Sequence, residues 1–401
     1  MVITTQYIIV SSKIKMSASS ENEMLLPGQI IRPLVKLGDV PAIVNKIYGL
    51  TTLSVKELNS YDDKNFYIQV ESTINNPHIK ELCPSGYVLK IVNSLDSKNE
   101  NLIKAQNQMM FFLHARGFRV PKPEKNIHGT YMTLEKLTVS SDEFVQNNAN
   151  EEPSGLHMVR LLTFIEGKIL HQVTYTKELF FECGAYLGKL NNELKDFCNE
   201  DLKSRKCLWS LESTPKLKKF VSAVKNEKQI NLVQEVLAAW NLNIIPEIHR
   251  LEKGFIHGDF NEQNIIVNTK SGDPTTFHID GLLDFGDIQY SCYLFEIAIA
   301  IMYQMVEVNC MPPNDVGGYV LAGYLTQRNI SKNDWDILKE CVAARFIQSL
   351  VLGAYSHEQD PGNGYLLVTA AKGWDVLSKF WKTPKEDILS RWKDIIKSYK
   401  A

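Results

Sequence analysis

Several features that would point to other kinds of protein are scarce in this chain. None of the seven cysteines among its 401 residues forms a C-x-x-C pair. Their number is odd and their spacing is wide, so neither a disulfide framework nor a zinc site is indicated, and a reducing compartment fits best. Charge of one sign is not in excess either, because 44 basic residues face 46 acidic ones. This balance gives no electrostatic argument for nucleic acid or an anionic membrane as a partner.

Long hydrophobic runs are missing as well. The longest apolar segment, 294–306, contains Glu296 and Gln304 and is too short to span a bilayer. Near the N-terminus only residues 7–10 form an apolar run, and lysines follow it rather than precede it, which is the wrong order for a secretory signal. The sequence therefore predicts a soluble, cytoplasmic protein with a small molecule, rather than nucleic acid or membrane, as its partner.

The most informative stretch is 255–287, where a polar loop follows one apolar strand and an acidic loop follows another. His257, Asp259 and Asn264 have the spacing H-x-D-x-x-x-x-N, and Asp284 begins a D-F-G triplet. This pattern matches the catalytic loop and the metal loop of kinases, in which one residue accepts a hydroxyl proton and others hold Mg²⁺ beside the phosphates. The alternative is a polar turn followed by a strand-end cap.

The flanking residues predict how these two loops meet. Residues 265–267 form an apolar strand, and 276–283 are its expected hairpin partner, which would deliver Asp284 to the edge where the catalytic loop lies. The next segment, 294–305, is apolar almost all round and predicts a helix that is buried on most sides. Glu296 in its first turn either complements the helix dipole or braces the active loops by hydrogen bonds.

The first part of the chain predicts a small antiparallel sheet with helices. The expected elements are a helix over 40–50, strands over 52–58, 65–71 and 87–92, and a helix over 101–115. Lys90 lies on an otherwise apolar strand, where its charge needs a partner. It would be the lysine that contacts the phosphates, as in V-A-I-K; the alternative is an edge-strand lysine that extends to water. A kinase orients this lysine through a helix glutamate, and here the facing residue is Gln106.

The second part of the chain is predominantly helical in pattern. A loop is expected over 139–155, a strand over 157–164, a hinge at Glu166-Gly167, and helices over 178–194, 229–242, 334–355, 366–381 and 386–399. Residues 1–25 show no sustained period. We therefore predict a disordered tail over 1–25, an N-terminal nucleotide-binding lobe over 26–165, and a C-terminal catalytic and substrate lobe over 166–401.

Three stretches together resemble the aminoglycoside phosphotransferase and choline kinase group, the small-molecule relatives of protein kinases. They are SYDDKNFYIQV (60–70), HGDFNEQNIIV (257–267) and LLDFGDIQYSCYLFEIAIAIMYQM (282–305). The resemblance implies an α+β, bilobal fold with a small antiparallel-sheet lobe and a larger, mainly helical lobe. It also implies GTP as phosphoryl donor, Mg²⁺, and phosphorylation of the side-chain hydroxyl of 5-hydroxylysine, in lysine degradation. ATP remains a possible donor.

The same resemblance assigns roles to individual residues. Asp259 would lie beside the acceptor hydroxyl, Asn264 and Asp284 would hold the metal, and Lys90 would contact the α- and β-phosphates. Ser60, Tyr61 and Asn65 would line the phosphate loop, which contains no glycine. Two departures are this glycine-free loop and Gln106, which can hydrogen-bond Lys90 but brings no charge. His257 would hold the loop backbone.

Three other readings are weighed against this one. A kinase for another small amino alcohol, using ATP, keeps the same site. A protein kinase is disfavoured because the segment after D-F-G-D soon enters a helix, which leaves no room for an activation loop. A pseudokinase is disfavoured because the four motif residues are intact. Since 5-hydroxylysine has a net positive charge, its pocket should present carboxylates, with Glu262, Asp287 and Glu307 as candidates.

Overall fold

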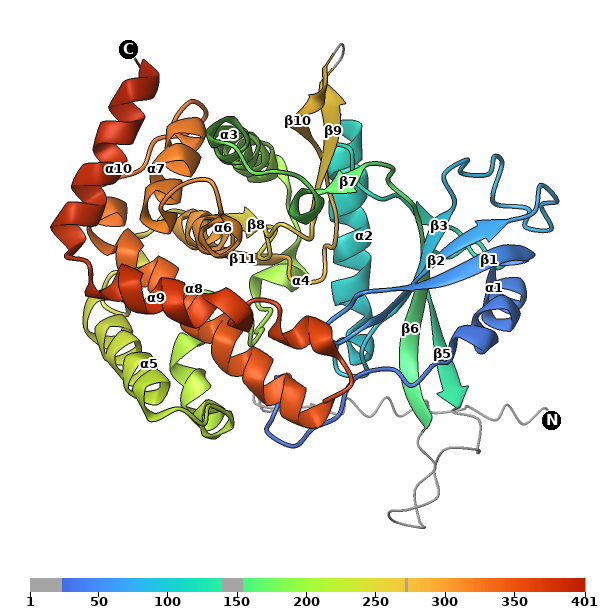
Figure 1. Ribbon diagram of the computed structural model, residues 1–401. Helices are drawn as coiled ribbons and strands as arrows, with labels where there is room; N and C mark the ends of the chain where they lie inside the picture. Colours follow the sequence, from blue (N-terminus) through green and yellow to red (C-terminus); the bar gives the residue numbers. More distant parts are fainter. Residues whose placement is uncertain (1–23, 139–153, 271–272, 401) are drawn as a thin grey trace, which may run out of the picture.

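The computed structural model describes residues 24–138, 154–270 and 273–400, and this part of the chain forms two lobes (Figure 1). The tail predicted over 1–25 and the loop predicted over 139–155 lie almost entirely outside the described residues. One lobe is built on an antiparallel sheet, and the other, larger lobe is mainly helical. The predicted bilobal α+β fold is therefore confirmed.

The smaller lobe contains one six-stranded sheet in the order β1-β2-β3-β6-β4, with β5 paired to β6. Its strands are β1 (Thr52–Leu58), β2 (Lys64–Val70), β3 (Tyr87–Ile91), β4 (Pro123–Glu124), β5 (Thr133–Thr138) and β6 (Ser154–Thr163). Its helices are α1 (Val40–Tyr48) and α2 (Glu100–Ala115). The predicted antiparallel meander of the first three strands is confirmed. Because β3 lies between β2 and β6, Lys90 is not on an edge strand.

Side chains alternate between the two faces of this sheet, as the period of a strand requires. Leu89 and Leu161 are buried in a cluster with α1, whereas Leu162 belongs to the larger core that includes α2. Lys90 and Arg160 are register partners on β3 and β6 and project from the same face as Leu162. Both charges are thereby carried to the side of the sheet that faces the second lobe.

Residues 164–167 connect the sheet to the larger lobe, which contains two small sheets. Their strands are β7 (Lys168–Ile169), β8 (Lys253–Ile256), β9 (Ile265–Lys270), β10 (Asp273–Leu282) and β11 (Gln289–Cys292). The antiparallel pairing of β9 with β10 confirms the predicted hairpin. At the base of this hairpin Leu282 pairs with Ile265, so the loops that end at Asn264 and begin at Leu283 lie side by side.

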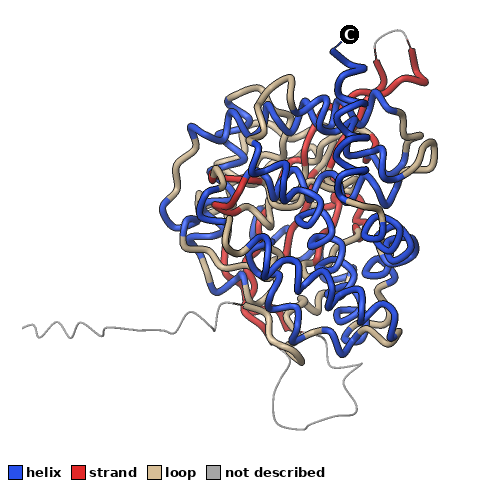
Figure 2. Tube along the Cα trace, turned by 90° about the vertical axis from the view of Figure 1, so that its left-hand side faces the viewer, coloured by secondary structure: helices blue, strands red, loops and turns tan. Residues whose placement is uncertain are grey.

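Helices make up most of the larger lobe and cover most of the face seen in Figure 2. They are α3 (Lys177–Glu193), α4 (Glu200–Lys203), α5 (Glu227–Ala239), α6 (Tyr293–Glu307), α7 (Pro313–Tyr324), α8 (Lys332–Gln359), α9 (Ala370–Lys382) and α10 (Lys385–Lys400). Every residue of α6 is buried, as predicted. Within the described part of the chain, no helix, α6 included, is both long enough and apolar enough to cross a membrane.

Candidate active site

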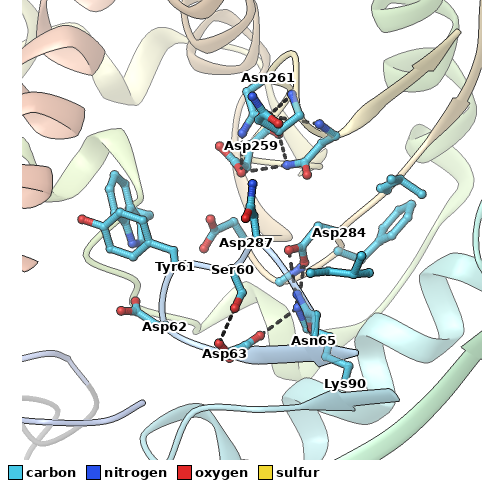
Figure 3. A pocket seen from close by; sticks show the side chains of 18 of the residues that line it. Ser60, Tyr61, Asp62, Asp63, Asn65, Lys90, Asp259, Asn261, Asp284 and Asp287 are labelled. Atoms are coloured by element: carbon cyan, nitrogen blue, oxygen red, sulfur yellow. Dashed lines mark hydrogen bonds and ion pairs between the residues drawn. The ribbon is translucent and has the colours of Figure 1, made fainter. Parts of the chain in front are cut away.

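A cavity of about 610 Å³ lies between the two lobes, with residues of both lobes in its wall. Pockets of this size accommodate nucleotide-sized and drug-sized ligands. All of the predicted site residues line it: Ser60, Tyr61, Asn65, Lys90, Asp259, Asn264 and Asp284 (Figure 3). Two of the three acidic candidates for substrate binding, Glu262 and Asp287, line it too.

The carboxylate of Asp259 is held by the loop that carries it. Its Oδ2 accepts hydrogen bonds from Asn264 Nδ2 at 2.9 Å and from Asn261 Nδ2 at 2.8 Å. Asn264 Nδ2 also donates to the main-chain oxygen of Asp259 at 3.0 Å. Because the amide nitrogen of Asn264 is engaged in this way, its amide oxygen is the atom left to bind a cation.

The second oxygen of Asp259 meets a residue that the sequence analysis did not identify. Arg345 NH2 lies 2.9 Å from Asp259 Oδ1, and the Arg345 side chain is 1% exposed. The same guanidinium donates to Gln348 Oε1 and to the hydroxyl of Tyr303. Arg345 belongs to α8, far from the catalytic loop in sequence, so no motif marks it. The sequence feature that could have indicated this residue is the position of an arginine inside the apolar stretch 341–352.

His257 holds the backbone of the catalytic loop, as expected from the sequence, and it also ties this loop to the metal loop. Its Nδ1 accepts from the Asp259 main-chain nitrogen at 3.3 Å, so its Nε2 carries the proton and donates to the main-chain oxygen of Leu283 at 2.9 Å. Burial lowers the pKa of His257, so the imidazole stays neutral. A neutral ring with both nitrogens engaged in this way acts as a brace for the two loops.

Gly258 and Glu296 fix the turn between His257 and Asp259. Gly258 has a φ of +81°, and a Cβ at this position would lie 2.3 Å from the main-chain oxygen of Asp287, so only glycine fits. Its main-chain nitrogen donates to both carboxyl oxygens of Glu296 at 3.2 Å. The bracing role of Glu296 is therefore the one that the structure bears out. Burial raises the pKa of Glu296 to about 8.

Lys90 is held by two carboxylates at the entrance to the metal loop. Its Nζ lies 2.8 Å from Asp63 Oδ2 and 3.2 Å from Asp284 Oδ1. Burial alone would lower the pKa of Lys90, but the charges of Asp284 and Asp63 outweigh burial and raise the pKa. The lysine is therefore cationic and available to phosphate oxygens.

Gln106, which could have hydrogen-bonded Lys90, contacts another residue. Gln106 Nε2 donates instead to the main-chain oxygen of Gly286 at 3.2 Å, which ties α2 to the metal loop. Asp63 supplies the carboxylate that a helix glutamate would otherwise bring. Its Oδ1 accepts from both nitrogens of Asn93, at 2.8 Å and 3.0 Å, so the carboxylate is fixed before any ligand arrives.

The turn between β1 and β2 is ordered by side chains rather than by glycine. Ser60 Oγ donates to the main-chain oxygen of Asp63 at 2.6 Å. Tyr61 packs edge-to-face on Trp209, with ring centroids 5.1 Å apart, and in Figure 3 it lies away from Lys90 and Asp284. Asn65 is the register partner of Lys90, and within the described residues its buried Oδ1 has no hydrogen-bond partner.

The metal loop offers oxygen atoms of the kind that Mg²⁺ prefers. Asp284 has a φ of +51°, and its Oδ1 accepts from the Gly286 main-chain nitrogen at 3.0 Å, so a tight turn aims the carboxylate. Burial would raise the pKa of Asp284, but Lys90 and the Gly286 hydrogen bond lower it. An ionised Asp284 and the free amide oxygen of Asn264 line the same cavity, so this pair fits a divalent cation beside phosphates.

Comparison with known proteins agrees with this geometry. The sequence pattern of the phosphotransferase enzyme family matches residues 80–326. A hydroxylysine kinase of Danio rerio is 31% identical over 365 residues, which cover 90% of this chain and 96% of the relative. A hydroxylysine kinase of Xenopus laevis is 32% identical over 390 residues, which cover 95% of this chain and 99% of the relative.

Solved structures show the same fold. An amicoumacin kinase in complex with AMP-PNP and Ca²⁺ superposes with a TM-score of 0.60 at 16% identity, covering 88% of this chain and 95% of that chain. A microcompartment-associated aminopropanol kinase superposes with a TM-score of 0.61 at 14% identity, covering 86% of this chain and 98% of that chain. The chain therefore belongs to the phosphotransferase enzyme family and is a kinase that acts on the alcohol group of a small molecule.

Proposed function

We propose that this chain transfers the γ-phosphoryl group of GTP to the side-chain hydroxyl of 5-hydroxy-L-lysine, as a step in lysine degradation. The similarity to hydroxylysine kinases over 90% of the chain or more supports the acceptor. The observation that carries the proposal is the arrangement of Asp259: a fixed carboxylate lines the same cavity as Lys90, Asn264 and Asp284.

The proposed roles follow from these contacts. Lys90 would contact the phosphates of the donor, and Asn264 and Asp284 would hold Mg²⁺ through oxygen atoms. The bound ion would neutralise phosphate charge during transfer. Asp259 would orient the acceptor hydroxyl and take its proton late in the reaction, because an alcohol is too weak an acid to ionise first.

The division of labour between the lobes is part of the proposal. Residues 26–165 would bind the nucleotide, since they carry Lys90 and the turn with Ser60, Tyr61 and Asn65. Residues 166–401 would supply catalysis and the acceptor site, since they carry Asp259. Apolar cavity residues from both lobes, among them Val88 and Leu162 of the smaller lobe and Ile266 of the larger, would enclose the base.

A donor and acceptor screen tests the proposal. The value of kcat/KM is measured for 5-hydroxylysine, choline, ethanolamine and homoserine, each with GTP and with ATP. We expect 5-hydroxylysine with GTP to be preferred, and lysine to bind without turnover because it lacks the hydroxyl. A clear preference for choline or ethanolamine would reject the acceptor, and a preference for ATP would reject the donor. An adenine nucleotide is the ligand in the amicoumacin kinase complex, so the ATP arm is essential.

A further inference from the structure

A group of acidic and polar side chains adjoins the catalytic loop without taking part in the contacts described above. The ligand atoms of His171, Glu262 and Glu307 lie within 4.8 Å of one another. Glu262 lies on the same loop as Asp259 and lines the cavity. Glu307 is the last residue of α6, and its Oε2 lies 3.2 Å from His171 Nδ1. The main-chain nitrogen of His171 donates to the main-chain oxygen of Glu262 at 3.2 Å, so the two segments are held together.

Two buried polar atoms in this group lack a partner. Glu262 is 5% exposed and Tyr175 is 4% exposed. Neither Glu262 Oε2 nor the Tyr175 hydroxyl forms a hydrogen bond within residues 24–138, 154–270 and 273–400. After burial itself, the charges of Glu262 and Glu307 are the main causes that raise the pKa of Tyr175, so its hydroxyl lies in the field of both carboxylates. Unsatisfied buried polar atoms of this kind call for a ligand.

The missing partner is a cation. Among the ion pairs of the described residues, no lysine or arginine reaches Glu262 or Glu307, and His171 is the one basic side chain beside them. Glu262 and Glu307 are both buried with their carboxylates close together, and burying carboxylates without a positive partner is unfavourable. A cation bound between the two carboxylates would supply the missing partner.

An organic ammonium suits this site better than a second metal ion. An ammonium group carries three N–H donors, which suit the unpartnered Glu262 Oε2 and Tyr175 hydroxyl together with the Glu307 carboxylate. The cavity reaches Glu262, so a group of the acceptor has access. Glu262 follows Asp259 on the same loop and lines the same cavity, so the group adjoins the carboxylate that would receive the hydroxyl proton.

We propose that Glu262 and Glu307, together with Tyr175 and His171, form the subsite that binds an ammonium group of the acceptor. The inference rests on the proposed function, in which the acceptor is an amino alcohol with two ammonium groups. The subsite selects acceptors that carry a positive charge at a fixed separation from the reacting hydroxyl. Neutral alcohols of the same length are rejected because they leave the carboxylates unpaired.

The test compares 5-hydroxylysine with two analogues that each lack one ammonium group, 2-amino-5-hydroxyhexanoic acid and 6-amino-5-hydroxyhexanoic acid. The wild-type protein should prefer 5-hydroxylysine over one of them by about tenfold or more in kcat/KM. In Glu262→Gln and in Glu307→Gln, kcat/KM for 5-hydroxylysine should fall by about tenfold, whereas kcat/KM for the disfavoured analogue should stay unchanged. The preference for 5-hydroxylysine should therefore disappear. Tyr175→Phe should reduce the preference less.

The matched control is Glu340→Gln. Glu340 is also buried and also has an unpartnered Oε2 among the described residues, but it pairs with Lys385 and does not line the cavity. This variant should keep the full preference. A preference that persists in the Glu262 and Glu307 variants would overturn the inference. If these variants kept the preference but needed more Mg²⁺ for activity, the group would be a metal site, and the inference would be overturned as well.

A binding measurement separates this inference from the proposed function. Lysine carries both ammonium groups without a reactive hydroxyl, whereas norleucine and 6-aminohexanoate each carry one. Calorimetric titration of these ligands into the nucleotide-loaded protein needs no turnover. Tighter binding of lysine that disappears in Glu262→Gln supports the subsite even if 5-hydroxylysine proves not to be the acceptor. Equal binding of all three ligands by the wild-type protein would overturn the subsite whatever the acceptor.

Discussion

Lys90 Nζ and Asp63 Oδ2 lie 2.8 Å apart, and this ion pair joins the centre of the sheet to the turn between β1 and β2. The turn that covers the proposed phosphate site therefore also orients the lysine that we propose contacts the phosphates. Asn93 holds the other oxygen of Asp63, so the pair does not depend on α2. This arrangement explains how the chain can orient Lys90 although Gln106, on α2, brings no charge and contacts Gly286 instead.

The first prediction concerns this pair. Asp63→Asn should lower kcat/KM by about tenfold to a hundredfold, mainly through a higher KM for the nucleotide, because it leaves Lys90 with one carboxylate partner. Steady-state kinetics with varied GTP measures the effect. Asp62→Asn is the neighbouring control and should change kcat/KM less. A Gln106→Glu substitution that restored the Asp63→Asn variant would contradict the account, since Gln106 contacts Gly286 rather than Lys90.

The second prediction concerns the proposed general base. Asp259→Asn should preserve the fold and nucleotide binding while lowering kcat by about a hundredfold or more, the range expected for the loss of a general base. Circular dichroism and calorimetry check folding and binding, and a coupled assay checks turnover. Turnover close to that of the wild type would remove Asp259 from the mechanism.

Arg345 should act through Asp259. Arg345→Lys keeps the charge but loses the planar set of donors that contacts Asp259, Tyr303 and Gln348 at once, so we expect kcat to fall by about tenfold or more with little change in nucleotide KM. In the Asp259→Asn background the same substitution should have almost no further effect on kcat. Fully additive losses in the double variant would show that Arg345 works independently of Asp259.

The proposed metal ligands lead to a separate prediction. Asp284→Ala should weaken nucleotide binding strongly when Mg²⁺ is present and only slightly when it is absent, because the substitution removes a carboxylate ligand. Calorimetric titration of GTP with and without Mg²⁺ distinguishes the two cases. Equal loss under both conditions, or activity that persists in excess chelator, would exclude Asp284 as a metal ligand.

Glu296 gives a pH-dependent prediction. Its pKa is raised to about 8 in the folded protein, whereas in the unfolded chain it would have the ordinary value of 4.5. Its contribution to stability is therefore fully present below pH 4.5 and is lost as the pH rises through about 8, since the unfolded state ionises first.

Glu296→Gln removes this titration while keeping an oxygen for the Gly258 nitrogen. The free energy of unfolding of the variant, relative to wild type, should accordingly improve by at least about 1 kcal/mol between about pH 5 and about pH 8. Urea denaturation at the two pH values measures it, with Glu178→Gln on the surface of α3 as the control. A difference that did not change with pH would mean that Glu296 is not stabilised in its protonated form.

The parts that could be predicted from the sequence are those in which local pattern decides structure. The period-two runs gave β1 and β3 to within one residue, and the apolar run 294–305 gave α6. The spacing of His257, Asp259 and Asn264 predicted the whole catalytic loop, because a kinase-like loop needs those residues at those intervals.

The parts that could not be predicted depend on contacts between distant segments. Arg345 reaches Asp259 across 86 positions of sequence, and although the apolar stretch around Arg345 indicates burial, nothing local indicates its partner. Asp63 carries no signal in the sequence, since a carboxylate in a turn is usually solvated, and only the folded sheet places it against Lys90. Helix α7 was missed because its Pro313, Gly317 and Gly318 weaken the helical signal that packing overrides.

The most direct measurement is phosphorus NMR of the product formed when the full chain, GTP, Mg²⁺ and 5-hydroxylysine react, with Asp259→Asn as the matched control. The account predicts one phosphomonoester on the C5 oxygen, formed by the wild-type protein and at least about a hundredfold more slowly by the variant. Phosphate released to water alone, or the same phosphomonoester formed at the same rate by the variant, would contradict it.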